Sequence, residues 1–382
     1  MAESAAVVVL ASFVGGWGHA EPLIETAQLA AALGHHVTFA GQQAVLPRLS
    51  ELGFDTAVVG PDTLGTDRLP LQRVDRDRER KVVREHFVKR FGSYRAAAIG
   101  RLLDQLESDT LLCDEVDVGA IAAAELLGVP SVTVNVAAAG RLVSPRTVGD
   151  VWNELRAELG LTIDADGTAL GGSLMLAPFP ASFRDPALPD MPQWRPVRPT
   201  VPRREPGTEL SARVYATLGT VFNVESGDLL SRLITGLGSV GVPSLVTVGP
   251  HIEPIEFAPA PQVRVEQFVP QHQVLAGCRA VVCHGGSGSL MAALAHGVPV
   301  VLLPMGADQP DNADRCEQLG CGLVLDPVDA TAGDIATAIQ RVIEEPSYGI
   351  SAGRLADEVA AQPPVADLPE LIGLLRRRTS PA

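Results

Sequence analysis

The residues best suited to chemistry lie in a turn of histidine, glycine and serine, from His284 to Ser289. This turn follows an apolar run and precedes a stretch typical of a helix. Glycines let a ligand approach the backbone, and the start of a helix offers free N–H groups and the positive end of its dipole. Ser287 and Ser289 add hydroxyl groups. The pattern predicts a cradle for a diphosphate beside His284, although a plain strand–helix turn with serine caps would have the same local sequence.

Two further segments place polar or aromatic groups at the expected ends of strands. Asp308 and Gln309 follow the apolar run 298–304, and an acid next to an amide there suits a polyhydroxylated ligand. The alternative is a helix capped by the residues that come next. Phe268 lies at the end of another predicted strand, where its ring could stack on a nucleobase, although an aromatic residue there is more often part of a core.

These segments belong to a chain in which apolar runs alternate with helical patterns. Continuous apolar runs predict strands that are buried on both faces, as in a parallel sheet. The alternation occurs twice, so the sequence predicts an α/β protein with two doubly wound, Rossmann-like domains that face a cleft. Predicted strands cover residues 5–13, 36–40, 111–113, 131–136, 214–218, 244–248, 263–268, 280–283, 298–304 and 323–325, and predicted helices cover 22–33, 118–127, 229–237, 287–295 and 311–319.

A proline-rich segment separates the two α/β patterns. Nine prolines fall within residues 178–206, a density that indicates an extended connection rather than a packed interior. We therefore expect an N-terminal domain over 1–190, a linker over 191–212 and a C-terminal domain over 213–382, whose last helix could pack back on the N-terminal domain. The charged stretch 68–95 predicts a solvated helix whose apolar residues face the protein.

The composition disfavours several classes of protein. The 382 residues carry a formal net charge of −15, which disfavours a nucleic-acid partner. No stretch is long and apolar enough to span a membrane, and the N-terminal run lacks the positive residues of a signal peptide. The five cysteines, an odd count, favour a reducing compartment, so we expect a cytoplasmic protein. Their C-x4-C spacings do not suit zinc, and the D-x-D motifs Asp75–Asp77 and Asp164–Asp166 are not at strand ends, so we expect no metal.

Together the chemical segments resemble the donor-binding signature of the family-one glycosyltransferases, which have the GT-B fold. The closest likeness is to bacterial enzymes that glycosylate antibiotics and other natural products. The likeness runs in order from Val263 to Pro327. It includes Phe268–Gln271, His284–Ser289, Gly297–Pro299, Asp308–Gln309 and Asn312–Ala313. Residues Ala216–Thr220 are similar to the turn that opens the family's C-terminal domain.

The resemblance implies an inverting, metal-independent hexosyltransferase. His19 falls on the family's catalytic base, and Asp114 fits the aspartate that orients it, with Asp117 close enough to compete. A neutral imidazole can take a proton from an acceptor hydroxyl, and the carboxylate would hold its tautomer. The donor-binding residues carried over from the family are Thr220, Phe268, Val269, Gln271, His284, Gly286, Ser287, Gly288, Ser289, Asp308 and Gln309.

The resemblance also implies a nucleotide diphosphate sugar as co-substrate, with no cofactor. Many members have a glutamate that binds the ribose hydroxyls where this chain has Ala292, which favours a dTDP-sugar over a UDP-sugar. We expect the sugar to be a deoxysugar. The acceptor is expected to be a small natural product in antibiotic or other secondary metabolism, bound by the loops 68–94 and 137–161. A homodimer is one possible assembly.

Three alternatives stay open. A dinucleotide-dependent oxidoreductase is disfavoured because Glu21 stands where the third glycine of the first turn belongs. A non-catalytic helper protein of the same fold is disfavoured because His19, Asp114 and the donor segments are all present. A nucleotide-sugar epimerase of similar architecture is disfavoured because the donor signature is that of the transferases.

Overall fold

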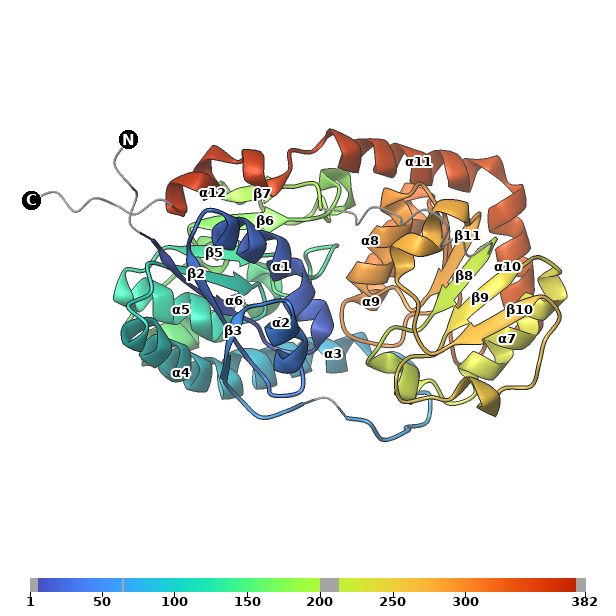
Figure 1. Cartoon of the computed structure of the whole chain (residues 1–382), viewed down its shortest axis with the longest axis horizontal. Coiled ribbons are helices and arrows are strands. Elements are labelled where there is room, and N and C mark those ends of the chain that lie inside the picture. The colour runs from blue at the N-terminus through green and yellow to red at the C-terminus, as the bar shows by residue number, and fades with distance from the viewer. Residues whose placement is uncertain (1–5, 64, 200–212, 376–382) are drawn as a thin grey trace, which may run out of the picture.

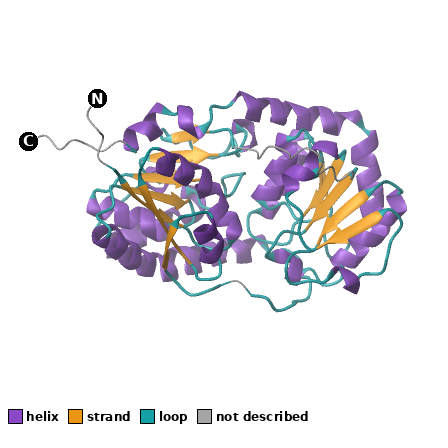
Figure 2. Cartoon of the chain, viewed as in Figure 1, coloured by secondary structure: helices purple, strands orange, loops and turns teal. Residues whose placement is uncertain are grey.

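The structure is a computed structural model that describes residues 6–63, 65–199 and 213–375. Two α/β domains lie side by side, each built on one parallel sheet with helices on both faces (Figure 1; Figure 2). The N-terminal sheet has the strand order β3-β2-β1-β4-β5-β6-β7, and the C-terminal sheet has the order β10-β9-β8-β11-β12-β13. The first strand of each sheet lies in its interior, as in a doubly wound fold, so the predicted fold class is confirmed.

The elements follow the predicted alternation. The strands are β1 Val8–Ser12, β2 His36–Gly41, β3 Asp55–Val58, β4 Thr110–Asp114, β5 Ser131–Val134, β6 Leu174–Ala177, β7 Trp194–Pro196, β8 Val214–Thr217, β9 Ser244–Thr247, β10 Val263–Glu266, β11 Ala280–Cys283, β12 Val300–Leu302 and β13 Gly322–Val324. The helices are α1 Trp17–Ala32, α2 Leu46–Glu51, α3 Arg76–Val82, α4 Phe91–Gln105, α5 Val118–Leu127, α6 Pro145–Glu158, α7 Leu229–Val240, α8 Ser287–Ala295, α9 Gln309–Leu319, α10 Ala332–Glu344, α11 Pro346–Ala361 and α12 Pro369–Leu374.

Apolar strand residues fill a core on each face of each sheet. Along β1, Val9 and Ala11 pack into one core while Leu10 packs into the other, because successive side chains alternate across a strand. Val281 and Val282 of β11 divide between the two C-terminal cores in the same way. Burial on both faces explains why these strands appear in the sequence as continuous apolar runs.

Helix α1 begins earlier than the sequence predicts. The predicted start is Pro22, yet α1 begins at Trp17 with Gly16 as its N-cap. In the first turn, His19 N donates to Gly16 O at 3.0 Å. Pro22 therefore lies inside the helix, where it has no N–H to give to the carbonyl four residues before it. The earlier start places His19 in the first turn of α1, close to the ends of β1 and β4.

The sequence analysis predicts one solvated helix over the charged stretch 68–95, and the structure shows that this prediction is wrong. It begins as an irregular segment that runs from the N-terminal domain to the C-terminal domain and back into α3 (Figure 1). A π-helical stretch, Val83–Arg90, then joins α3 to α4. The arginines of the first part pair with acids of the other domain. Its interdomain ion pairs are Arg68–Glu256, Arg73–Asp326, Arg73–Asp329, Arg76–Asp311 and Arg76–Asp314.

The proline-rich segment is partly built into the N-terminal domain. Strand β7 lies inside the predicted linker 191–212 and pairs with β6 as the edge strand of the sheet. An edge strand tolerates residues without an N–H, so a proline-rich run can form one. The sheet therefore extends beyond the predicted boundary at residue 190, whereas residues 200–212 lie outside the described residues. At the other end of the chain, α11 leads back toward the N-terminal domain (Figure 1), where Leu371 of α12 packs in the core.

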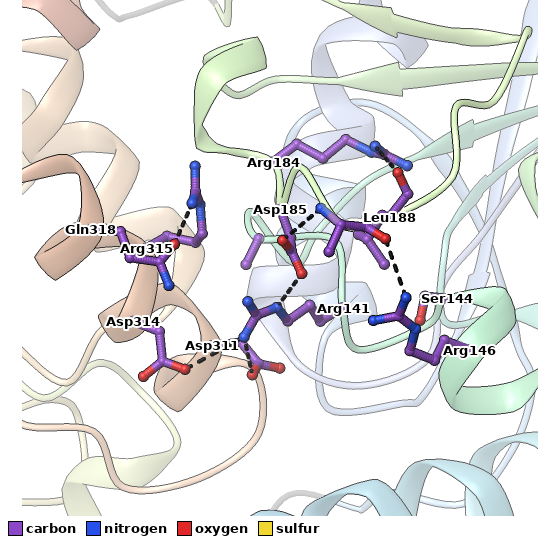
Figure 3. Close-up of polar contacts among 12 residues, drawn as sticks. Arg141, Ser144, Arg146, Arg184, Asp185, Leu188, Asp311, Asp314, Arg315 and Gln318 are labelled. Atoms are coloured by element: carbon purple, nitrogen blue, oxygen red, sulfur yellow. Dashed lines mark hydrogen bonds and ion pairs between the residues drawn. The ribbon is translucent and has the colours of Figure 1, made fainter.

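A cluster of arginines and acids joins the two domains beside α9 (Figure 3). Arg141 of the N-terminal domain pairs with Asp185 of the same domain at 2.6 Å. It also contacts the carboxylates of Asp311 and Asp314 on α9, each at 3.4 Å. Arg315 of α9 in turn donates to two backbone carbonyls of the N-terminal domain. These contacts hold α9 against the N-terminal domain.

Candidate active site

The first candidate pair lies where β1 and β4 end. Cys113 of β4 pairs with Ser12 of β1, so the next residue, Asp114, lies beside the turn that enters α1. His19 Nδ1 and Asp114 Oδ2 are 3.2 Å apart, and Asp114 is fully buried. The structure thus brings the two predicted catalytic residues together. The Asp114 carboxylate also accepts three backbone N–H groups, from Val14, Val116 and Asp117, at 2.8 to 2.9 Å.

The contact with Asp114 fixes the proton arrangement of His19. Because an ionised carboxylate only accepts hydrogen bonds, Nδ1 must donate, and Nε2 keeps a free lone pair. Burial lowers the pKa of His19, but the hydrogen bond and charge of Asp114 outweigh it. With the charges of Asp308 and Glu115, they raise the pKa above its ordinary value. The His19 side chain is 29% exposed, so a ligand can reach this strengthened base.

Asp117, the competing partner for His19 in the sequence analysis, has other partners. It pairs with the buried Arg95, whose Nε lies 3.2 Å from Asp117 Oδ1. Asp117 also accepts a hydrogen bond from Ser12 Oγ at 2.6 Å. Arg95 in turn donates to the backbone carbonyls of Phe13 and Val59. Asp117 therefore holds the ends of the strands together next to the site. Of the two aspartates, only Asp114 contacts His19.

The turn from β11 to α8 holds a histidine atom without a partner. His284 is 8% exposed, and its buried Nδ1 has no hydrogen-bond partner among the described residues. Burial lowers the pKa of His284 to about 4, so the imidazole is neutral at neutral pH. Buried polar atoms nearly always have a partner, so this nitrogen is left for a water molecule or a ligand.

Glycines make room for this imidazole. A Cβ on Gly219, whose φ is +77°, would lie 2.7 Å from His284 Cε1, and a Cβ on Gly286 would lie 2.5 Å from His284 Nε2. Larger residues would therefore displace the ring. Gly286 is the N-cap of α8, whose first N–H groups have no partner within the helix. Gly288 in that first turn is exposed, so the backbone there is open to a ligand.

The two serines of the turn make different contacts. Ser287 Oγ donates to Asp308 Oδ2 at 2.7 Å and accepts from Ala138 N of the N-terminal domain at 2.8 Å. Its one hydrogen is already donated, so this hydroxyl joins the two domains rather than offering a hydrogen to a ligand. Ser289 Oγ accepts from Gln271 Nε2 at 2.9 Å, which leaves the Ser289 hydrogen free to bind a ligand.

Asp308 and Gln309 follow β12 at the same edge of the C-terminal sheet. Helix α9 begins at Gln309, two residues before the predicted start at 311, and Asp308 is its N-cap. Gln309 Oε1 accepts from Met305 N at 2.7 Å and Gly306 N at 3.2 Å, so this side chain shapes the preceding turn. Burial raises the pKa of Asp308, although the hydrogen bond from Ser287 opposes that rise.

Asn312, to which the sequence analysis assigns no role, joins the two halves of the site. It is fully buried, and its Nδ2 donates to Asp308 Oδ2 at 2.7 Å and to Gly285 O at 2.9 Å. Its Oδ1 accepts from Ala139 N of the N-terminal domain at 3.0 Å. Its place in the family's donor signature, one helical turn after Asp308, is the sequence signal for it. The charge of Asp308 also contributes to the raised pKa of His19, so an acid of the C-terminal domain acts on the base of the N-terminal domain.

The remaining predicted donor residues differ in exposure. Phe268 is 62% exposed, so its ring is accessible for stacking. The Val269 side chain is buried in the C-terminal core, which leaves only its backbone atoms for the predicted donor contact. Thr220 is exposed and follows Gly219, which contacts His284.

A small cavity lies at the strand ends of the N-terminal domain. It has a volume of about 30 Å³, and its lining includes Glu115, Phe179, Arg184 and Trp194. Burial raises the pKa of Glu115 to about 7, although its carboxylate accepts hydrogen bonds from Asn135 Nδ2 and two backbone N–H groups. The sequence analysis missed Glu115, for which the position directly after Asp114 is the only signal.

Both D-x-D motifs have structural contacts. Asp75 caps α3 by accepting from Asp77 N at 3.0 Å and Arg78 N at 3.1 Å. Asp164 accepts from the indole N–H of Trp152 at 2.9 Å. In the described residues, no three histidine, cysteine or acidic side chains gather as metal ligands would. No helix within the same ranges is long and apolar enough to cross a membrane.

Comparison with known proteins finds a family model that matches the C-terminal part of the chain. Residues 237–373 match the family model described as erythromycin biosynthesis protein CIII-like, C-terminal domain. Over 98% of its length the chain is similar to L-demethylnoviosyl transferase of Streptomyces niveus, with 27% identity and 100% of that protein covered. It shares 38% identity with 4'-demethylrebeccamycin synthase of Lentzea aerocolonigenes, over 42% of this chain and 37% of that protein.

Coverage of the more identical relatives is partial. In three curated relatives that share 33% to 38% identity with it, the chain aligns with only 37% to 38% of their length. Among solved structures, the glycosyltransferase SsfS6 of Streptomyces sp. SF2575, complexed with thymidine diphosphate, is similar with a TM-score of 0.72 and 23% identity, over 96% of this chain and 99% of that chain. The GT-B fold that the sequence resemblance implies is confirmed, and the homologues and structural neighbours are glycosyltransferases of antibiotic biosynthesis.

Proposed function

We propose that this protein is an inverting glycosyltransferase that moves a sugar from a nucleotide diphosphate to a small natural-product acceptor. The observation that carries the proposal is the buried, unpartnered Nδ1 of His284 at the N-terminus of α8, in the domain that faces the His19–Asp114 pair. A neutral imidazole and the free N–H groups of a helix start suit a diphosphate, and a carboxylate-bound imidazole suits the removal of a proton.

In the proposed reaction, His19 Nε2 takes the proton of an acceptor hydroxyl. The resulting oxygen nucleophile attacks the anomeric carbon from the face opposite the diphosphate, so the bond to the diphosphate oxygen breaks and the configuration inverts. Asp114 stabilises the imidazolium that forms. His284, the first amides of α8 and the Ser289 hydroxyl stabilise the negative charge on the departing diphosphate.

The donor is proposed to be a dTDP-sugar, in preference to a UDP-sugar, and its sugar a deoxysugar. Ala292 in place of an acid leaves no carboxylate to bind a second ribose hydroxyl. The SsfS6 structure is a complex with thymidine diphosphate, and several relatives are named for deoxysugar transfer, among them the 2-deoxy-L-fucose transferase of Streptomyces galilaeus. The exposed Phe268 ring is available to stack on the base.

The acceptor is proposed to bind on the N-terminal side of the site. Loop 137–161 includes Ala137, Ala138, Gly140 and Val143 of the wall of the small cavity on this side of the site. The stretch 68–79, which the sequence analysis assigns to acceptor binding, is instead bound to the C-terminal domain. Cytoplasmic location and a homodimer stay predictions from the sequence.

The reaction is proposed to need no metal, because protein N–H and O–H donors already surround the proposed diphosphate position. In the two D-x-D motifs, Asp75 caps α3 and Asp164 accepts a hydrogen bond from the indole N–H of Trp152. A helper protein or an epimerase is the less favoured reading, because relatives such as L-demethylnoviosyl transferase are named as transferases.

Thermal unfolding with a panel of nucleotide diphosphates tests the proposal. Thymidine diphosphate is expected to raise the melting temperature more than UDP, and both more than ADP or GDP. Adding EDTA is expected to leave these shifts, and the transfer rate with a dTDP-sugar, unchanged. Stabilisation by NAD but by no nucleoside diphosphate would contradict the proposed function. Turnover that EDTA abolishes and magnesium restores would contradict its metal independence.

The pH profile of transfer to an alcohol follows from the raised pKa of His19. A base must be unprotonated, so kcat/KM is expected to fall as the pH drops through the raised pKa, with a midpoint above 6.5. Asp114→Asn removes the charge that raises this pKa, so the midpoint should move to lower pH at a reduced plateau. The same midpoint in wild type and in Asp114→Asn would show that His19 is not the group that titrates.

A further inference from the structure

The N-terminal domain reaches the proposed sugar site through the charged stretch 68–79. Three arginines of this stretch bind acids of the C-terminal domain, and Leu69 N donates to Val224 O at 2.9 Å. The stretch is therefore an interdomain strap that ends in α3. Distances within its ion pairs include 2.6 Å for Arg68–Glu256, 2.7 Å for Arg73–Asp329 and 2.7 Å for Arg76–Asp314.

Glu79 of α3 is the acid of this strap that faces the other domain. Its Oε2 accepts a hydrogen bond from Ala307 N at 3.0 Å. It is half-buried, whereas residues 75–78 and 80 around it are exposed. A Cβ built on Gly306 would lie 3.7 Å from Glu79 Cδ, so the side chain lies directly against the turn that precedes α9.

That turn carries strain, and Glu79 supplies its last hydrogen bond. Ala307 has a φ of +52°, in the left-handed region that residues with a side chain rarely adopt. Three successive N–H groups lie in this turn. The first two, on Met305 and Gly306, donate hydrogen bonds to Gln309 Oε1 of the same domain. The third, on Ala307, is held in the described residues by Glu79 alone.

The residue after Ala307 is Asp308, whose backbone direction this turn sets. Asp308 occupies the N-cap position of α9, its carboxylate binds Ser287 and Asn312, and its charge helps to raise the pKa of His19. Without the Glu79 contact, the strained peptide before Asp308 would lose its only N–H acceptor. Because Glu79 belongs to the N-terminal domain, the turn is complete only when the two domains are docked.

We propose that Glu79 is a positioning residue that sets the Asp308–Gln309 turn for the sugar of the donor when the domains dock. This inference rests on the proposed function. Glu79 touches neither the nucleotide cradle nor His19, so it should matter for the sugar and for turnover but not for the nucleotide diphosphate.

The test compares Glu79→Ala with Glu79→Gln, whose amide oxygen can accept the same N–H. Glu79→Ala is expected to lower kcat/KM for the sugar donor by roughly tenfold to a hundredfold, the usual effect of losing a charge-assisted hydrogen bond. The affinity for thymidine diphosphate should stay within about twofold of wild type, and Glu79→Gln should recover most of the loss. Asp77→Ala is the matched control, since Asp77 is 92% exposed on the same helix and pairs only with Arg80.

Hydrogen exchange gives a readout that does not depend on activity. A peptide that spans residues 303–309 should exchange faster in Glu79→Ala than in wild type, Glu79→Gln or Asp77→Ala. Unchanged exchange, an unchanged kcat/KM, or an equal loss of thymidine diphosphate affinity would overturn the inference. A wild-type protein that transfers no sugar would instead refute the proposed function, and the exchange experiment would still decide whether Glu79 holds the turn.

Discussion

Replacing His19 with alanine is expected to lower kcat for an alcohol acceptor by about 10²- to 10⁴-fold, the usual share of general acid–base catalysis. The imidazole is held by Asp114 at 3.2 Å and is the reachable member of the pair. Its loss removes proton abstraction but leaves the C-terminal domain intact, so the affinity for thymidine diphosphate should stay near that of wild type. Single-turnover rates, measured beside donor titrations, check both halves of this expectation.

His36→Ala is the matched control for that experiment, because His36 is an exposed histidine at the start of β2 in the same domain. It should leave both values unchanged. Asp114→Asn should cost a smaller factor than His19→Ala, since it misorients the base without deleting it. The acceptor must be un-ionised at the assay pH, because an ionised one needs no base. Near-normal single-turnover rates in His19→Ala would remove His19 from the mechanism and make Glu21 the next candidate.

Replacing His284 with alanine is expected to weaken thymidine diphosphate binding by about 10- to 150-fold, or ~1.5–3 kcal/mol, the range for a hydrogen bond to a charged group. The buried Nδ1 has no other partner in the described residues, so the bound diphosphate would be its only acceptor. Since burial lowers the pKa of His284 to about 4, the imidazole binds as a neutral donor, and its contribution should persist across neutral pH. Isothermal titration calorimetry measures the change.

His251→Ala controls for the loss of a histidine in the same domain, since His251 is exposed. Melting temperatures of both variants separate a loss of binding from a loss of folding. His284 contacts Gly219 and Gly286, so a smaller side chain leaves space but forces no clash. A dissociation constant for thymidine diphosphate that is the same in His284→Ala and in wild type would move the nucleotide site away from this turn.

The parts of the fold that depend on local sequence were predictable. The run 280–283, the glycines after it and the helix 287–295 match β11 and α8 residue for residue, because strand, turn and helix start each have their own local signal. The pairing of His19 with Asp114 followed from a family resemblance, and the structure brings the two side chains together. Parallel strands end at the same edge of a sheet, which is why residues 95 positions apart meet there.

The parts that depend on distant partners were not predictable. The hydroxyl of Ser287 looks like a ligand donor in sequence, but it bonds to Ala138, 149 residues away. The charged strap looks solvated because the acids that bind its arginines lie in the other domain. Glu79 has no local signal of function, since it contacts a turn that only the docked domains bring near. Asn312 is part of the family signature, but nothing in the local sequence indicates its bond to Ala139 of the other domain.

The account as a whole depends on where the nucleotide diphosphate binds. The most direct measurement is a crystal structure of the wild-type chain with thymidine diphosphate. We expect the diphosphate within hydrogen-bond distance of His284 Nδ1 and the first amides of α8, with the base against Phe268. A diphosphate bound at any other position, with the His284 turn unchanged and unoccupied, would contradict the account.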